Sequence, residues 1–171
     1  FRMIEKYIDK KVYGSSKILI TVSRNCLNSL SERSPYLPKK KLHFIYNGVN
    51  DEFDKYKNVK KENFFIMLST YTSIKGYDLL INIGKILKTK KINFLIKIYG
   101  YGKNHEYKNL KNKINNNNLH DIIKLNPFTT EAIFELKKSL GLICLSQSQE
   151  AFGLTLIEAM SQGVPILTTN V

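Results

Sequence analysis

The sequence has no tryptophan, only two cysteines, and only three arginines against 24 lysines. Two cysteines, Cys26 and Cys144, are too few for a disulfide framework, so we expect a protein of a reducing compartment such as the cytoplasm. No apolar stretch reaches the roughly 18 residues that a membrane-spanning helix needs. The scarcity of arginine argues against specific phosphate recognition by the basic surface, because lysine lacks the planar fork of the guanidinium group.

The sequence also lacks the usual signatures of metal and cofactor chemistry. His43, His105 and His120 have no metal-ligand spacing, and there is no D-x-D pair or nucleophile motif. Residues 100–102, Gly-Tyr-Gly, begin like a dinucleotide-binding G-x-G-x-x-G, but His105 occupies the third glycine position, which excludes NAD binding. We therefore expect neither a metal nor an organic cofactor.

Charge is distributed unevenly along the chain. The formal net charge is +13, yet no lysine or arginine follows Lys138. Only Glu150 and Glu158 are charged beyond that point, and they are separated by the seven residues AFGLTLI. The overall charge suits an anionic partner only non-specifically, and a solvated basic surface is its simplest interpretation. The two carboxylates in the otherwise uncharged segment are the more specific signal.

The segment around these glutamates predicts a loop followed by a short helix. Gly153 allows a tight turn after Glu150, and residues 154–162 have helical spacing, with Glu158 in the second turn. Helix N-terminal N–H groups between the two acids suit a phosphate, and the carboxylates suit sugar hydroxyls. A solvated glutamate or a simple helix-dipole contact would give the same spacing, so both alternatives stay open. The apolar face predicted for this helix consists of Leu156, Ile157 and Met160.

The same segment resembles the signature of the retaining glycosyltransferases of family 4, which have the GT-B fold. That signature has two glutamates separated by seven residues, with F-G-L between them and E-A-M-x-x-G-x-P from the second glutamate onward. Three further patches resemble the family in the same order along the chain. They are residues 45–50 (I-P-N-G-V-D in the family), residues 75–80 (K-G-x-D-L-L) and residues 99–102 (a G-x-G turn).

Alternation of short apolar runs with helical segments of about 10–15 residues predicts an α/β fold with a doubly wound, Rossmann-like parallel sheet. Residues 47–61 are polar and irregular and indicate a linker. We expect strands at 18–22, 42–46, 64–68, 92–99, 122–125, 142–145 and 164–167, and helices at 3–13, 24–33, 75–88, 104–115, 130–140 and 154–162. In the helix at 75–88 we expect Leu79, Leu80, Ile83 and Leu87 to face inward.

The resemblance implies a two-domain GT-B architecture. Residues 1–56 would be the last part of the N-terminal, acceptor-side domain together with the linker. Residues 57–171 would be the C-terminal nucleotide-sugar-binding domain, truncated at its end. We therefore expect an internal fragment that is inactive by itself, because other acceptor-side groups would precede Phe1.

Ligands of doubly wound sheets bind beyond the C-terminal ends of the strands, and the candidate patches all follow predicted strands. By resemblance, Glu150 would hold the transferred sugar and Glu158 the ribose of the donor. Lys75 and the N–H groups near the start of the last helix would stabilise the departing diphosphate. The donor-binding candidates besides Glu158 are Thr70, Gly100, Gly102, Asn126, Phe128, Phe152, Gly153 and Leu154, with Glu150 and Lys75 as the catalytic pair.

One stretch departs from the family pattern. Residues 69–73, Ser-Thr-Tyr-Thr-Ser, contain no arginine, whereas the family usually has one shortly before the lysine at position 75. A contact worth about 1.5–3 kcal/mol would be absent, so donor binding would be weaker, the donor would differ, or activity would be lost. A solvated Lys75 and a core position for Phe128 are the simpler alternatives to their proposed roles.

The expected function is that of a retaining glycosyltransferase acting in cell-surface polysaccharide or glycolipid synthesis. It would move a sugar from a nucleoside diphosphate sugar to a hydroxyl of a glycan or lipid-linked acceptor, in the cytoplasm or at an anionic membrane face, without a nucleic-acid partner. One alternative is a sugar-nucleotide epimerase or a glycogen- or starch-synthase-like enzyme. Another, of a different class, is a basic module that binds nucleic acid or an anionic membrane.

Overall fold

The computed structural model describes residues 2–50, 52–148 and 150–170. They form two compact units that divide between Gly48 and Val49, upstream of the boundary expected at residues 56 and 57.

The first unit contains two parallel strands, β1 and β2, and two longer helices. Ser23 caps the second helix as the sequence predicts, because its side-chain oxygen accepts the backbone N–H of Cys26 at 3.1 Å. The elements of this unit are α1 (Arg2–Ser15), β1 (Leu19–Thr21), α2 (Arg24–Arg33), the 3-10 turn η1 (Lys39–Lys41) and β2 (Leu42–Phe44).

The second unit is built on a five-stranded parallel sheet with the strand order β5-β4-β3-β6-β7. The chain starts in the central strand β3, runs outward to β5, and then returns to add β6 and β7 on the other side. This reversal is a topological switch between β3 and β6, and open α/β sheets bind ligands at the C-terminal edge of such a switch. The strands are β3 (Phe64–Leu68), β4 (Leu95–Tyr99), β5 (Ile123–Asn126), β6 (Gly141–Cys144) and β7 (Ile166–Thr168).

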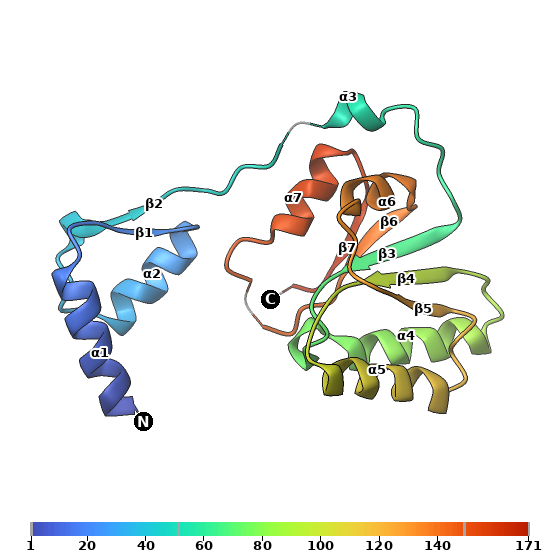
Figure 1. The fold of residues 1–171 in the computed structure, drawn as a ribbon, viewed down its shortest axis with the longest axis horizontal. Helices are drawn as coiled ribbons and strands as arrows, with labels where there is room; N and C mark the ends of the chain where they lie inside the picture. Colours follow the sequence, from blue (N-terminus) through green and yellow to red (C-terminus); the bar gives the residue numbers. More distant parts are fainter. Residues whose placement is uncertain (1, 51, 149, 171) are drawn as a thin grey trace. The chain divides into compact units, whose positions relative to one another are not determined.

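Helices cover both faces of this sheet, with α4 and α5 on one face and α6 and α7 on the other (Figure 1). Successive side chains of β3 point to opposite faces of the sheet, as they do in any strand. Met67 packs in the core under α4 and α5, whereas Phe64 and Ile66 pack in the core under α6 and α7. The predicted doubly wound α/β fold is confirmed. The helices are η2 (Ser73–Lys75, 3-10), α4 (Tyr77–Thr89), α5 (Asn104–Asn116), α6 (Ala132–Lys138) and α7 (Leu154–Ser161).

One helical turn, α3 (Phe53–Tyr56), lies in the stretch that the sequence indicates as an irregular linker. Its aromatic side chains pack on α6, within the second unit. The ring of Tyr56 lies 5.9 Å from that of Phe134, and the ammonium group of Lys137 lies 4.2 Å from the ring centre of Phe53. These contacts explain why the division between the units precedes α3.

Two of the predicted helix faces are wrong in part. In α4 the buried residues are Tyr77, Leu80, Ile81 and Gly84, a stripe with i, i+3, i+4, i+7 spacing, while Leu79 is 37% exposed. In α7 the small side chain of Ala159 is fully buried, whereas Met160 is 65% exposed. Glycine and alanine at these positions let the helices approach the sheet closely, although such small residues carry little apolar signal in the sequence.

Candidate active site

Lys75 and Glu150 meet at the topological switch of the sheet. Lys75 ends the turn η2 that follows β3, and Glu150 lies in the loop that follows the neighbouring strand β6. The Lys75 ammonium donates to Glu150 Oε1 at 2.5 Å, with about a quarter and a third of the two side chains exposed (24% and 33%). The structure therefore brings together the two predicted catalytic residues, which are 75 positions apart in the sequence.

The backbones of the two loops are themselves in contact. The N–H of Gln147 donates to the carbonyl oxygen of Ile74 at 2.7 Å. Gly76 has a left-handed backbone with a φ of 78°, and a Cβ at this position would lie 1.9 Å from the carbonyl oxygen of Leu145. Glycine is thus required where the chain turns from Lys75 into α4.

Ser146 is a further member of this cluster that the sequence analysis did not single out. Its hydroxyl donates to the same Glu150 Oε1 at 2.5 Å, and its carbonyl oxygen accepts the Thr169 hydroxyl at 2.6 Å. Ser146 is 3% exposed, so its position is fixed by packing. A pocket of about 20 Å³, room for one water, is lined by Lys75, Ser146, Glu150 and Thr155 among others. This pocket is too small to hold a sugar.

The charge state of Glu150 follows from these contacts. Burial alone would raise the pKa of its carboxyl, but the hydrogen bonds from Lys75 and Ser146 outweigh burial and hold the pKa below its ordinary value. Glu150 is therefore a carboxylate at neutral pH. It can accept hydroxyl groups and does not serve as a proton donor.

The loop after Glu150 leads into the N-terminus of α7. Gly153 adopts the left-handed conformation, with a φ of 79°, as the tight turn predicted after Glu150 requires. The exposed Leu154 is the first residue of the helix, and Phe152 lies half-buried before it. Leu156 donates its N–H to the carbonyl oxygen of Gly153 at 3.0 Å, so among the described residues the N–H groups of Leu154 and Thr155 are the ones at the start of the helix that suit an anion.

Glu158 lies in the second turn of α7, as predicted, and its side chain is half-buried. Burial raises the pKa of its carboxyl. Glu158 is not among the described residues that line the pocket around Glu150. The two acids therefore differ, since one is held by a lysine and a serine and the other is a partly desolvated carboxyl.

A larger aromatic pocket follows the neighbouring strands β4 and β5. Its volume is about 480 Å³, and it is lined by Gly100, Gly102 and Phe128, three of the predicted donor-binding residues. Phe128 is 62% exposed, so it is not a core residue, and its ring meets that of Tyr101 edge to face at 5.9 Å. Exposed aromatic faces beside glycine backbone suit a planar base. Its other described lining residues are Tyr71, Tyr101, Asn104, Tyr107, Leu125 and Pro127.

Tyr71 lines this pocket and connects the two strand ends beside it. Its hydroxyl lies 3.0 Å from the carbonyl oxygen of Gly100 and 3.1 Å from that of Asn126, so it joins the ends of β4 and β5. The predicted residue Asn126 contributes this carbonyl group and is not among the described lining residues. Gly100 is needed for close approach, because a Cβ there would lie 2.0 Å from the carbonyl oxygen of Ser69.

Thr70 is a candidate that is not among the described lining residues of either pocket, and the same holds for Asn126, Phe152, Gly153, Leu154 and Glu158. Its hydroxyl lies 3.2 Å from that of Thr72, and its carbonyl oxygen accepts the Tyr77 hydroxyl at 3.1 Å. This loop therefore offers hydroxyl groups near Lys75 but no second cation.

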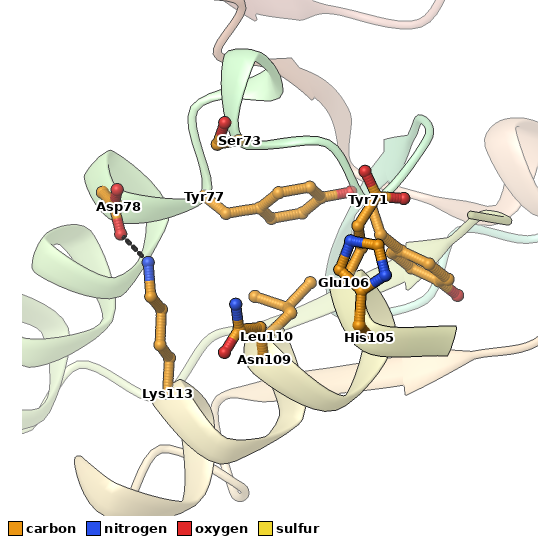
Figure 2. Close-up of a pocket in the computed structure, with 9 residues that line it drawn as sticks. All are labelled: Tyr71, Ser73, Tyr77, Asp78, His105, Glu106, Asn109, Leu110 and Lys113. Atoms are coloured by element: carbon orange, nitrogen blue, oxygen red, sulfur yellow. Dashed lines mark hydrogen bonds and ion pairs between the residues drawn. The ribbon is translucent and has the colours of Figure 1, made fainter. Parts of the chain in front are cut away.

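A third pocket of about 250 Å³ lies between α4 and α5 (Figure 2). Figure 2 shows Tyr77 and Ser73 on one side, Leu110 and Asn109 on the other, and an ion pair between Asp78 and Lys113 at one end. That pair has the same 2.5 Å separation as Lys75 and Glu150, but its side chains are 73% and 47% exposed. It provides a matched exposed pair for comparison.

Across residues 2–50, 52–148 and 150–170, no group of three or more histidine, cysteine, aspartate or glutamate side chains is arranged to hold a metal ion. No helix within the described part of the chain has the length and apolar character to span a bilayer.

Residues 49–171 match the profile of the family described as glycosyl transferases group 1. The match covers more than half of the chain and includes the whole cluster around Lys75 and Glu150. The chain belongs to the group 1 glycosyltransferases. This membership favours glycosyl transfer over a binding module for nucleic acid or membranes.

Individual group 1 glycosyltransferases are similar over most of this chain. An uncharacterized glycosyltransferase of Methanocaldococcus jannaschii is 29% identical over 166 residues, which cover 97% of this chain and 44% of the relative. One from Haemophilus influenzae is 33% identical, covering 82% and 40%. A glycosyltransferase of O-antigen biosynthesis from Escherichia coli is 27% identical, covering 80% and 39%. The chain thus spans less than half the length of these relatives.

Solved structures share the fold of this group 1 glycosyltransferase. The pneumococcal O-GlcNAc transferase, solved with UDP and GlcNAc, has a TM-score of 0.77 at 22% identity, over 96% of this chain and 33% of that one. The Anabaena protein HepE, solved with UDP-glucose, has a TM-score of 0.81 at 16% identity, over 98% and 49%. At these identities the likeness establishes the GT-B type of fold.

The sequence analysis of this glycosyltransferase missed Ser146, Thr155 and Tyr71. Ser146 could have been found, because it is the first polar residue after a buried strand at the ligand-binding edge. No local signal marks Tyr71, whose role depends on carbonyl groups 29 and 55 positions away.

Proposed function

We propose that this chain provides the donor site of a retaining glycosyltransferase of family 4. The enzyme takes a nucleoside diphosphate sugar and passes the sugar to a hydroxyl of a glycan or lipid-linked acceptor. The observation that carries this proposal is the Lys75–Glu150 pair at the switch between β3 and β6, beside the aromatic pocket beyond β4 and β5.

The two neighbouring sites match the two ends of such a donor. The aromatic pocket suits the base, and the half-buried Glu158 suits the ribose hydroxyls. Glu150 accepts hydroxyls of the transferred sugar, while Lys75 and the first-turn N–H groups of α7, near Phe152, Gly153 and Leu154, face the diphosphate.

The transfer step needs stabilisation of the leaving group. The bond between the anomeric carbon and the diphosphate oxygen breaks, and the diphosphate leaves with both bonding electrons. The acceptor hydroxyl gives its proton to the departing diphosphate oxygen, and the acceptor oxygen bonds to the anomeric carbon on the same face of the sugar. Negative charge grows on the diphosphate in the transition state, where a lysine and helix N–H groups act most strongly. No metal or organic cofactor takes part in this proposal.

Similar proteins suggest which donor and which acceptor should be tested first. Because the Escherichia coli relative acts in O-antigen biosynthesis, and solved neighbours hold UDP or UDP-glucose, a UDP-sugar and a cell-surface glycan are the first compounds to test. The enzyme acts on the cytoplasmic side, and its net charge of +13 allows peripheral contact with an anionic membrane. The proposal includes no nucleic-acid partner.

A donor screen followed by two variants of the full-length protein tests the proposal. Thermal shift against UDP-, GDP- and ADP-sugars should find one stabilising donor, and a CMP-sugar, with a single phosphate, is the negative comparison. Glu158→Ala should weaken donor affinity and Glu150→Ala should lower turnover, whereas the exposed Asp78→Asn should change neither. Wild-type affinity in the first variant together with wild-type turnover in the second would refute the assignment.

A further inference from the structure

We propose that the Lys75–Glu150 ion pair makes the site discriminate between the intact donor and the nucleoside diphosphate that remains after transfer. This inference rests on the function proposed above and concerns the regulation of the same site. It assigns to Glu150 an effect on product release in addition to its contact with the sugar.

The two carboxylate oxygens of Glu150 differ in their hydrogen bonds. Oε1 accepts both Lys75 and Ser146 at 2.5 Å, so the carboxylate is held by two donors on one side. Oε2 accepts no hydrogen bond from the described part of the chain, and we assign it to a hydroxyl of the sugar. Lys75 is the only basic residue among the described residues that line the pocket, and no basic residue follows Lys138 in the sequence.

The local charge of this cluster is therefore close to zero. A carboxylate beside a lysine offsets most of its attraction for a third, anionic group, because the two charges act over nearly the same distance. The lowered pKa of Glu150 keeps this offset in place at neutral pH. A diphosphate that approaches Lys75 must either displace Glu150 or bind next to its negative charge.

Donor and product respond differently to this arrangement. The free diphosphate carries about one more negative charge than the sugar-linked diphosphate, because its terminal phosphate is a monoester. It is repelled more by Glu150, and it has no sugar hydroxyl to donate to Oε2. The intact donor regains through its sugar what it loses through repulsion. Glu150 thus weakens product binding selectively, which favours release.

The test measures the binding of two probes that carry no sugar, UDP and inorganic pyrophosphate, to the full-length protein by calorimetry. Glu150→Gln keeps the size of the side chain and removes its charge. We expect it to bind both probes at least about threefold more tightly than the wild type, because the repulsion is gone. The preference for the intact donor over UDP should fall by a similar factor.

Two controls separate this effect from a general change in charge or folding. Asp78→Asn removes the acid of the exposed ion pair of equal length and should leave both affinities unchanged. Relative to the single variant Lys75→Met, the double variant Lys75→Met/Glu150→Gln should show no gain, and the two single variants with the double variant give the coupling between the two side chains.

The outcomes distinguish the two proposals. If the wild type binds neither UDP, pyrophosphate nor any donor sugar nucleotide, the proposed function and this inference both fail. If the wild type binds them but Glu150→Gln, with an unchanged melting temperature, binds UDP and pyrophosphate equally or more weakly, only the discrimination by the ion pair is overturned.

Discussion

Gly76 packs directly against the carbonyl group of Leu145, so closely that a Cβ at position 76 would lie 1.9 Å from the carbonyl oxygen. Gly76 follows Lys75, and Leu145 precedes Ser146, so this contact sets how near the loops after β3 and β6 lie. The distance between the lysine and the carboxylate that it holds therefore depends on a position with no side chain.

Gly76→Ala should destabilise the second unit by at least about 2 kcal/mol, because it combines a left-handed backbone with a clash against backbone atoms. Urea unfolding measures the change. Gly14→Ala is the comparison, since a Cβ there meets nothing within 4 Å and alanine favours the helix α1. Equal stability of the two variants would contradict the close contact.

Tyr71→Phe should cost about 1–2 kcal/mol of unfolding free energy, because the buried Tyr71 hydroxyl is the shared partner of the Gly100 and Asn126 carbonyl groups. It should also weaken nucleotide binding, since those carbonyl groups shape the aromatic pocket. Tyr36→Phe, at a position 41% exposed, is the control and should leave stability unchanged. An unaltered urea midpoint for Tyr71→Phe would show that the hydroxyl does not join the strand ends.

Phe128→Ala should raise the Kd for the nucleotide by about five- to hundredfold, the range expected for the loss of stacking on one base. Its effect on the melting temperature should be small, because Phe128 is 62% exposed. Calorimetric titration and thermal unfolding measure the two quantities. Ile86→Ala, at another exposed apolar position, should alter neither, and a loss of stability without a loss of affinity in Phe128→Ala would assign this ring to packing.

Glu158 makes stability depend on pH in a defined direction. Burial raises the pKa of its carboxyl above the value in the unfolded chain, about 4.3, so its stabilising contribution is present below that pH and is lost as the pH rises through the folded pKa. Glu158→Gln should therefore melt at a higher temperature than the wild type at pH 7 and at nearly the same temperature at pH 4.

Thermal unfolding at both pH values, with the exposed Glu131→Gln as control, checks this prediction. A Glu158→Gln variant that is no more stable than the wild type at pH 7 would argue that the carboxylate is well solvated. Since the same variant should bind donor less well, stability and affinity are expected to change in opposite directions.

Much of the fold was accessible from local patterns. The apolar run at residues 64–68 predicts β3 with its observed bounds, and Ser23 predicts the start of α2. The errors arose where small residues form the buried surface, as with Gly84 in α4 and Ala159 in α7, because these positions carry little apolar signal. The turn α3 was missed because its stability depends on Phe134 and Lys137, far along the chain.

Spacing and composition were enough to nominate Glu150 and Glu158, because they are the only charged residues in the segment that follows Lys138. Lys75 was nominated through its resemblance to the family pattern. Folding was needed to show that Lys75 and Ser146 share one oxygen of Glu150. Such pairings depend on strand order: β3 and β6 become neighbours only after the chain reverses direction across the sheet. No local sequence signal shows that β3 and β6 are neighbours. Their pairing depends on the whole sheet, which is covered by helices on both faces.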